Sequence, residues 1–147
     1  MRGCGASRAG LHSAAAECPH RVLWPDLARR LAAAVPAPDL APLNTVYGIA
    51  THSADDAHAL AALLNSRWLC ALARLVADPA RGGFRRFNAR VVRGLPVPPA
   101  DTAAWRTLAA LGRRGATDDV CIAELLQLDA RDRRALAPLA PHPADPV

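Results

Sequence analysis

The sequence contains no lysine, few aromatic residues and no long apolar run. All 18 basic residues of the 147-residue chain are arginines, which together with abundant alanine and proline is typical of a GC-rich coding sequence. Aromatic side chains make up only 4% of the chain, so we expect a core built mainly from Leu and Val. The length suits one domain. No apolar stretch approaches the roughly 20 residues of a membrane span, so we expect no membrane partner.

The paired spacings of zinc ligands are also missing. Cys4, His12, Cys18 and His20 contain no C-x(2–4)-C or H-x(3–5)-H unit, so we expect no metal. Cys70 falls within a helical pattern and is interpreted as a small core residue. Reduced thiols and a cytoplasmic location fit this cysteine usage best.

Acidic residues are absent from one segment, between Pro79 and Ala100. Five arginines occur in it, namely Arg81, Arg85, Arg86, Arg90 and Arg93. The other 13 arginines equal the 13 acidic residues, so the net charge of +5 comes entirely from this segment. A localised basic patch indicates a polyanionic partner, because Arg binds phosphate through a bidentate fork and binding releases counterions. The alternative is a solvated basic loop.

The N-terminal third is expected to contain short secondary-structure elements that end at prolines. Residues 1–20 lack a continuous apolar region and are interpreted as a disordered leader. The apolar run Arg21–Pro25 predicts a strand end, and Asp26–Val35 suits a brief helix that ends before Pro36. The alternation of apolar and polar residues in Leu43–Ile49 predicts a second strand.

The strongest helical pattern covers Ser53–Asp78. Ser53 is a good N-cap, and leucines recur on one face at steps of three and four. Asn65 and Ser66 interrupt this pattern with two poor helix formers. Such a polar pair needs a reason: it either contacts a ligand, or it bonds the adjoining loop or caps a kink.

Three shorter helices are expected after the proline run at 96–99. The first covers about Asp101–Arg113, the second begins at a Thr117 cap, and the third begins at an Asp129 cap. We therefore predict a helix-dominated α+β fold with a few short strands. It divides into a leader (1–20), a recognition-type domain (21–99), a C-terminal helical extension (100–138) and a loose tail (139–147).

Several motifs occur together in an order that resembles a known family. Leu64-Asn65-Ser66 lies in a Leu-rich helix, and a Gly/basic loop then leads to the exit Leu95-Pro96-Val97-Pro98. Val22–Asp26 and Leu43–Tyr47 look like that family's strands, and Val120–Leu136 is similar to its closing helix pair. The sequence resembles the TaqI-like C-terminal specificity domain of adenine-specific DNA methyltransferases, over roughly residues 21–136.

The resemblance implies a module that contacts double-stranded DNA while a separate domain binds S-adenosylmethionine and methylates a flipped adenine. The family's catalytic motif, Asn/Asp-Pro-Pro-aromatic, does not occur here, because Val97-Pro98-Pro99-Ala100 has the wrong flanking residues. We therefore expect no catalytic and no cofactor-binding residue in this chain. The expected partners are duplex DNA and a methyltransferase catalytic domain or subunit in a restriction-modification system.

The candidate DNA-binding residues follow from the charge and the resemblance. The five arginines are expected to contact phosphates, with one or two reaching guanine edges, and Asn88 is a candidate reader of an adenine edge. Phe84 and Phe87 either stack on bases or anchor the segment to the core. The full set is Arg81, Arg85, Arg86, Arg90, Arg93, Asn65, Ser66 and Asn88.

Two alternatives to DNA recognition stay open at this point. The C-terminal helices suit a small protein-interaction module with no nucleic-acid role, and the reading frame also suits a gene remnant without stable function. Hydrolase chemistry is not favoured, because the adjacent carboxylates Asp55-Asp56 and Asp118-Asp119 diverge on a helix and are explained as helix-start charges.

Overall fold

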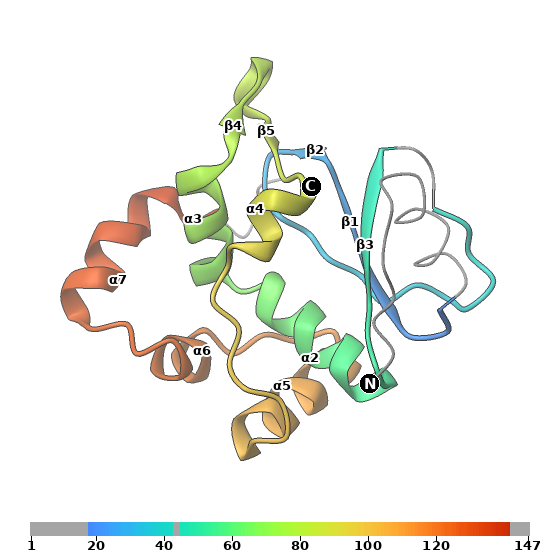
Figure 1. Cartoon of the computed structure of the whole chain (residues 1–147). Helices are drawn as coiled ribbons and strands as arrows, with labels where there is room; N and C mark the ends of the chain where they lie inside the picture. The colour runs from blue at the N-terminus through green and yellow to red at the C-terminus, as the bar shows by residue number, and fades with distance from the viewer. Residues whose placement is uncertain (1–17, 43–44, 142–147) are drawn as a thin grey trace.

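The computed structural model describes residues 18–42 and 45–141, in which helices predominate over a few short antiparallel strands (Figure 1). The predicted helix-dominated α+β class is confirmed. Residues 1–17 and 142–147, which hold most of the expected leader and tail, lie outside the described residues.

An antiparallel strand pair forms one side of the molecule (Figure 1). β1 (Arg21–Pro25) pairs with β3 (Val46–Ala50), so that Trp24 lies opposite Tyr47 and their rings stack with centroids 6.1 Å apart. The first four residues of β1 are buried, as expected for a strand covered by helices. The strand predicted at Arg21–Pro25 is confirmed, and the second strand lies at the end of its predicted range.

The helix predicted over Asp26–Val35 is wrong. The segment is extended: β2 (Leu27–Ala28) pairs with a later strand, and Ala34 forms an isolated bridge with Leu23 through two backbone hydrogen bonds of 2.9 Å. The apolar face expected for that helix, Leu27 with Leu31, is also wrong, because Leu27 is exposed whereas Ala28 and Leu31 are buried. The backbone groups of this segment bond to other segments.

The helix predicted over Ser53–Asp78 is two helices, bent by 70° relative to each other at the Asn65-Ser66 pair. α2 (Ala54–Leu64) is capped by Ser53, and α3 (Arg67–Val76) is capped by Ser66. In the described part of the chain no single helix is long and apolar enough to cross a membrane. Taken together, the two helices of this bent pair reach the length and apolar composition of a membrane span, and nothing else about them points to one.

The C-terminal helices belong to the same core as the N-terminal half. α5 (Ala103–Arg113) packs along α2, while α6 (Asp119–Leu125), α7 (Ala130–Leu136) and the 3-10 turn η2 (Ala137–Leu139) pack against α3. The N-cap predicted at Asp129 is confirmed, with a capping box. The cap of α6 is Asp118, not Thr117, since the Asp118 carboxylate accepts from two backbone N–H groups.

Burial shows no separation between the predicted recognition domain and the helical extension. One cluster of buried side chains joins Trp24 and Leu64 from the first part to Trp105, Leu108 and Ile122 from the second. Leu139 and Ala140, which belong to the predicted tail, also pack against this cluster. The core therefore includes side chains from η2 and the residue after it.

Candidate nucleic-acid interface

The basic segment forms a hairpin followed by a short helix. β4 (Asp78–Pro79) and β5 (Arg85–Arg86) are joined by the 3-10 turn η1 (Arg81–Gly83), and β5 lies between β4 and β2 in a three-stranded sheet. The loop expected from the sequence is therefore a hairpin, and it projects from the helical body at the top of Figure 1. This placement exposes its tip on the side away from α5.

Two glycines allow the tight turn at the tip. Gly82 and Gly83 have φ angles of 71° and 79°, in the left-handed region that residues with a Cβ rarely adopt. The Ala80 N–H donates to the Phe84 carbonyl at 2.8 Å and closes the hairpin across these glycines. Arg81 is thereby presented at the tip with an exposed side chain.

Arg85 and Arg86 lie on opposite faces of the hairpin, because neighbouring side chains alternate along a strand. Arg85 is half-buried and donates to the Ala77 carbonyl at 3.1 Å. Arg86 is exposed and forms an ion pair of 2.7 Å with Asp26 from the turn before β2. Asp78 is its cross-strand neighbour, so carboxylates on both sides offset the charge of Arg86.

The helix after the hairpin carries the other two arginines. α4 (Ala89–Arg93) begins at Asn88, whose Oδ1 accepts hydrogen bonds from the backbone N–H groups of Arg90 and Val91. The side chain of Asn88 therefore has a capping role. Arg90 and Arg93 are three residues apart and both exposed, which places them on one face of α4.

Phe87 anchors the segment between hairpin and helix. It is fully buried, its N–H donates to the Asp26 carbonyl at 2.6 Å, and its carbonyl accepts from the Trp24 indole at 2.7 Å. Of the two roles considered for this ring, core anchoring fits its burial. Phe84 is half-buried, and the Arg29 guanidinium lies 5.2 Å from its ring centre.

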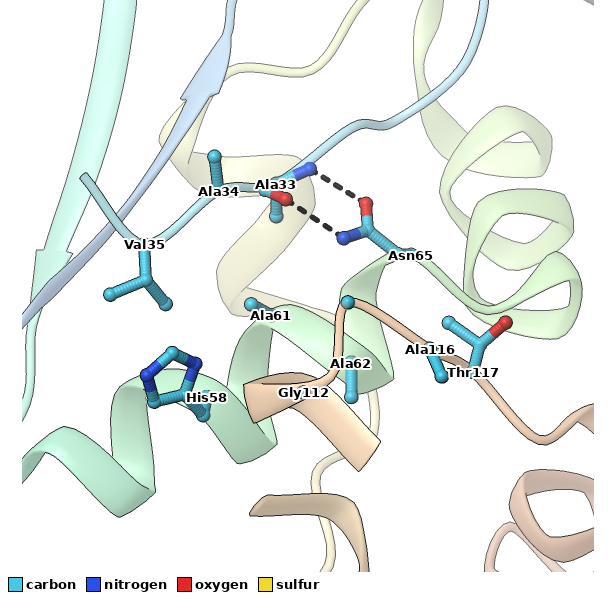
Figure 2. Close-up of a pocket in the computed structure, with 11 residues that line it drawn as sticks. Ala33, Ala34, Val35, His58, Ala61, Ala62, Asn65, Gly112, Ala116 and Thr117 are labelled. Carbon is cyan, nitrogen blue, oxygen red and sulfur yellow. Dashed lines mark hydrogen bonds between the residues drawn. The ribbon is translucent and has the colours of Figure 1, made fainter. Parts of the chain in front are cut away.

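Asn65 and Ser66 hold the bend between α2 and α3. The Asn65 amide both accepts from the Ala33 N–H and donates to the Ala33 carbonyl, each at 2.8 Å (Figure 2). Ser66 is fully buried and its hydroxyl accepts from the Leu69 N–H at 3.2 Å. Of the two roles considered for this pair, the structural one matches these contacts, and neither side chain adds to the basic surface.

A cavity of about 200 Å³ lies beside Asn65, between α2 and the chain after α5 (Figure 2). Its wall consists mainly of alanines and glycines, with polar groups from His58, Asn65 and Thr117. His58 is the only ionisable side chain among these lining residues, and the Thr117 hydroxyl lies at the other end of the cavity (Figure 2), so the lining does not hold a nucleophile within reach of a base. The cavity follows from the small side chains where α5 approaches α2.

The remaining reactive groups have structural explanations. Burial raises the pKa of the Cys70 thiol to about 12, so this core cysteine stays protonated. Asp56 accepts from the Trp105 indole at 2.8 Å and from the Ser53 hydroxyl at 2.8 Å, and Asp55 pairs with Arg113 on the surface. Within residues 18–42 and 45–141, no three His, Cys, Asp or Glu side chains gather to form a metal site.

The predicted residues thus separate into two groups. The five arginines Arg81, Arg85, Arg86, Arg90 and Arg93 lie on the hairpin and α4, where Arg81, Arg86, Arg90 and Arg93 are exposed, whereas Asn65, Ser66 and Asn88 support the backbone. Sequence reasoning missed Arg29, which the β2–β5 pairing places beside the hairpin. The cause is the helix predicted over Asp26–Val35, because a helix there would not pair with β5 and would not place Arg29 beside the hairpin.

No family model matches the sequence, and no curated protein matches it.

Proposed function

We propose that this chain is a DNA target-recognition module whose contact surface is the β4–β5 hairpin together with α4. The observation that carries the proposal is the location of the charge excess. All five positive charges in excess over the acidic residues lie in this one segment, and Arg81, Arg90 and Arg93 are exposed on it. Phosphate contacts by Arg supply most of the sequence-independent affinity for DNA.

The shape of the segment supports duplex DNA as the partner. The major groove of B-DNA admits a two-stranded β-ribbon or an α-helix, and the segment offers both. The hairpin presents Arg81 at its exposed tip, and α4 presents Arg90 and Arg93, so that both elements offer arginines for phosphate contacts.

The resemblance to methyltransferase specificity domains supports the wider role. In this proposal the module directs an adenine-specific, S-adenosylmethionine-dependent methyltransferase or restriction-modification enzyme to its target in the cytoplasm. Cofactor and catalytic residues then belong to another domain or subunit. An Asn-Pro-Pro-aromatic motif in the reading frame directly upstream would support this role, and an unrelated frame there would leave only the DNA-binding part of the proposal.

The test is duplex binding as a function of salt, measured by fluorescence anisotropy. Replacement of Arg81, Arg90 and Arg93 by Gln is expected to reduce the slope of log K against log[salt] by about 2.7, since each phosphate contact contributes about 0.9. A matched control replaces three exposed arginines elsewhere: Arg106, Arg114 and Arg131. Arg85 and Arg86 should contribute less, because both already have protein partners.

The same measurements separate the alternatives. A protein-interaction module without nucleic-acid function would show no binding, or binding insensitive to salt and to the triple replacement. A gene remnant without a stable fold would lack a cooperative thermal transition. Equal loss in the variant and in the control would show that only total charge matters, and would contradict a specific surface.

A further inference from the structure

Arg29 lies outside the basic segment in sequence, but the sheet places it beside the hairpin. β2 runs antiparallel to β5 with Leu27 opposite Arg86 and Ala28 opposite Arg85. Continuing this register brings Arg29 level with Phe84, and the Arg29 guanidinium carbon lies 5.2 Å from the centre of the Phe84 ring. A residue 52 positions before Arg81 therefore belongs to the same surface.

The face on which Arg29 lies is the outward one. Side chains alternate along a strand, so Arg29 shares a face with Leu27, and therefore with Arg86 opposite it, while the intervening Ala28 is buried. Leu27, Arg29 and Arg86 are all exposed. This face of the small sheet thus carries two guanidinium groups and one aromatic ring.

The contacts of Arg29 orient its charge without neutralising it. A guanidinium stacked on an aromatic face keeps its edge N–H donors directed away from the ring, where they match phosphate oxygens. No carboxylate in the described ranges forms an ion pair with Arg29, in contrast to Arg86. The Arg74 guanidinium donates to the Arg29 carbonyl at 3.1 Å, so a further cation lies beside its backbone.

We propose that Arg29 is a phosphate-binding residue, with Phe84 as the platform that positions it. In the complex it contacts the DNA backbone on the flank of the duplex site that the hairpin engages. This inference rests on the proposed DNA-binding function and adds a second chain segment to its surface. A phosphate contact carries no base information, so its contribution is the same for every DNA sequence.

The test compares Arg29→Gln, Arg29→Lys and Phe84→Leu with the full-length protein in anisotropy titrations from 50 to about 200 mM salt. Arg29→Gln is expected to reduce the salt slope by about 0.9 and the affinity about eightfold near 0.1 M salt, equally for unrelated duplexes. Arg29→Lys keeps the charge and should keep the slope. Phe84→Leu keeps both the charge and the apolar contact, and should weaken binding by less than Arg29→Gln.

Arg106→Gln is the matched control, because Arg106 is an exposed arginine on α5 with a backbone carbonyl partner. Thermal melts of each variant separate lost contacts from lost folding. An unchanged slope and affinity for folded Arg29→Gln, alongside weakened binding by the Arg81/Arg90/Arg93 variant, would overturn the role of Arg29 and leave the proposed function standing. Absence of duplex binding by the wild-type protein would overturn both.

Discussion

Gly112 of α5 lies against the backbone carbonyl group of His58 in α2, so closely that a Cβ at position 112 would overlap with the carbonyl oxygen and carbon. This contact sets the distance between the two helices that join the N-terminal and C-terminal parts of the core. Only a residue without a side chain permits the approach. The cavity beside Asn65 shares this wall.

Gly112→Ala is therefore expected to destabilise the fold. Alanine has the better helix propensity by about 1 kcal/mol, but overlap with a backbone carbonyl forces the helices apart and costs more. We expect a net loss of about 2 kcal/mol or more in the free energy of unfolding, measured by urea denaturation. Gly94→Ala serves as control, since a Cβ there meets its nearest atoms at 3.5 Å and 3.6 Å. Equal stability of both variants would contradict the close approach.

Asp56 should make part of the stability depend on pH. The hydrogen bond from the Trp105 indole, followed by that from the Ser53 side chain, lowers the pKa of Asp56 below its ordinary value of 3.8. The folded state thus binds the proton more weakly than the unfolded state. The resulting stabilisation is present above pH 3.8 and is lost as the pH falls through the folded-state pKa.

Urea denaturation of wild type and Asp56→Asn at several pH values tests this coupling. The difference in unfolding free energy between the two proteins should be largest near neutral pH and shrink below pH 3.8. Trp105→Phe retains the ring but removes the indole N–H, and should raise the pKa of Asp56. Asp55→Asn is the control, because its ion pair with Arg113 is exposed and contributes little. A pH-independent difference would show that Asp56 acts only as a neutral hydrogen-bond acceptor.

The sequence predicts most helices here because their signals are local. Ser53 and Asp129 cap the helices expected at these residues, and the leucine spacing identifies the buried face of α2 at Leu60 and Leu64. Beyond the bend the spacing fails, because Leu75 is exposed and Leu69 is buried. The failure over Asp26–Val35 has a non-local cause: its backbone bonds to β5, to Leu23 and to Asn65. No periodicity within those ten residues encodes such partners.

In the candidate site, too, the sequence shows the local features and does not show the contacts between distant residues. The charge excess of residues 79–100 is visible in the sequence, but its screening by Asp26 depends on a contact across 60 positions. Arg29 joins the surface by the same strand pairing. Asn65 and Ser66 form an unusual polar pair that is visible in the sequence, whereas their role at the bend depends on the Ala33 backbone, 32 residues away from Asn65.

Asn65→Ala should separate those two roles experimentally. The change leaves the N–H and carbonyl groups of the largely buried Ala33 without their amide partner, and we expect a loss of about 2 kcal/mol in unfolding free energy. DNA affinity of the folded fraction should be unchanged in anisotropy titrations. Asn65→Asp keeps the acceptor but removes the donor, and should fall between wild type and Asn65→Ala in stability. Wild-type stability with weakened DNA binding would instead assign Asn65 to the DNA interface.

Asp26→Asn is expected to strengthen DNA binding, under the proposed function. The Asp26 carboxylate pairs with Arg86 at 2.7 Å and repels phosphate, so its replacement by the neutral amide of similar shape makes one more cation available. We expect the salt slope to steepen by about 0.9 and the affinity to rise about eightfold near 0.1 M salt.

A double-mutant cycle assigns this gain to Arg86. Arg86→Gln alone should change the affinity little, whereas in the Asp26→Asn background it should remove the gain, giving a coupling between the two positions. Thermal melts check that the exchange leaves the fold intact, since the Asp26 backbone carbonyl still accepts from Phe87. Strong loss of binding from Arg86→Gln alone, with no effect of Asp26→Asn, would mean that Arg86 leaves Asp26 to contact DNA in the wild-type complex. The ion pair would then be a property of the free protein only.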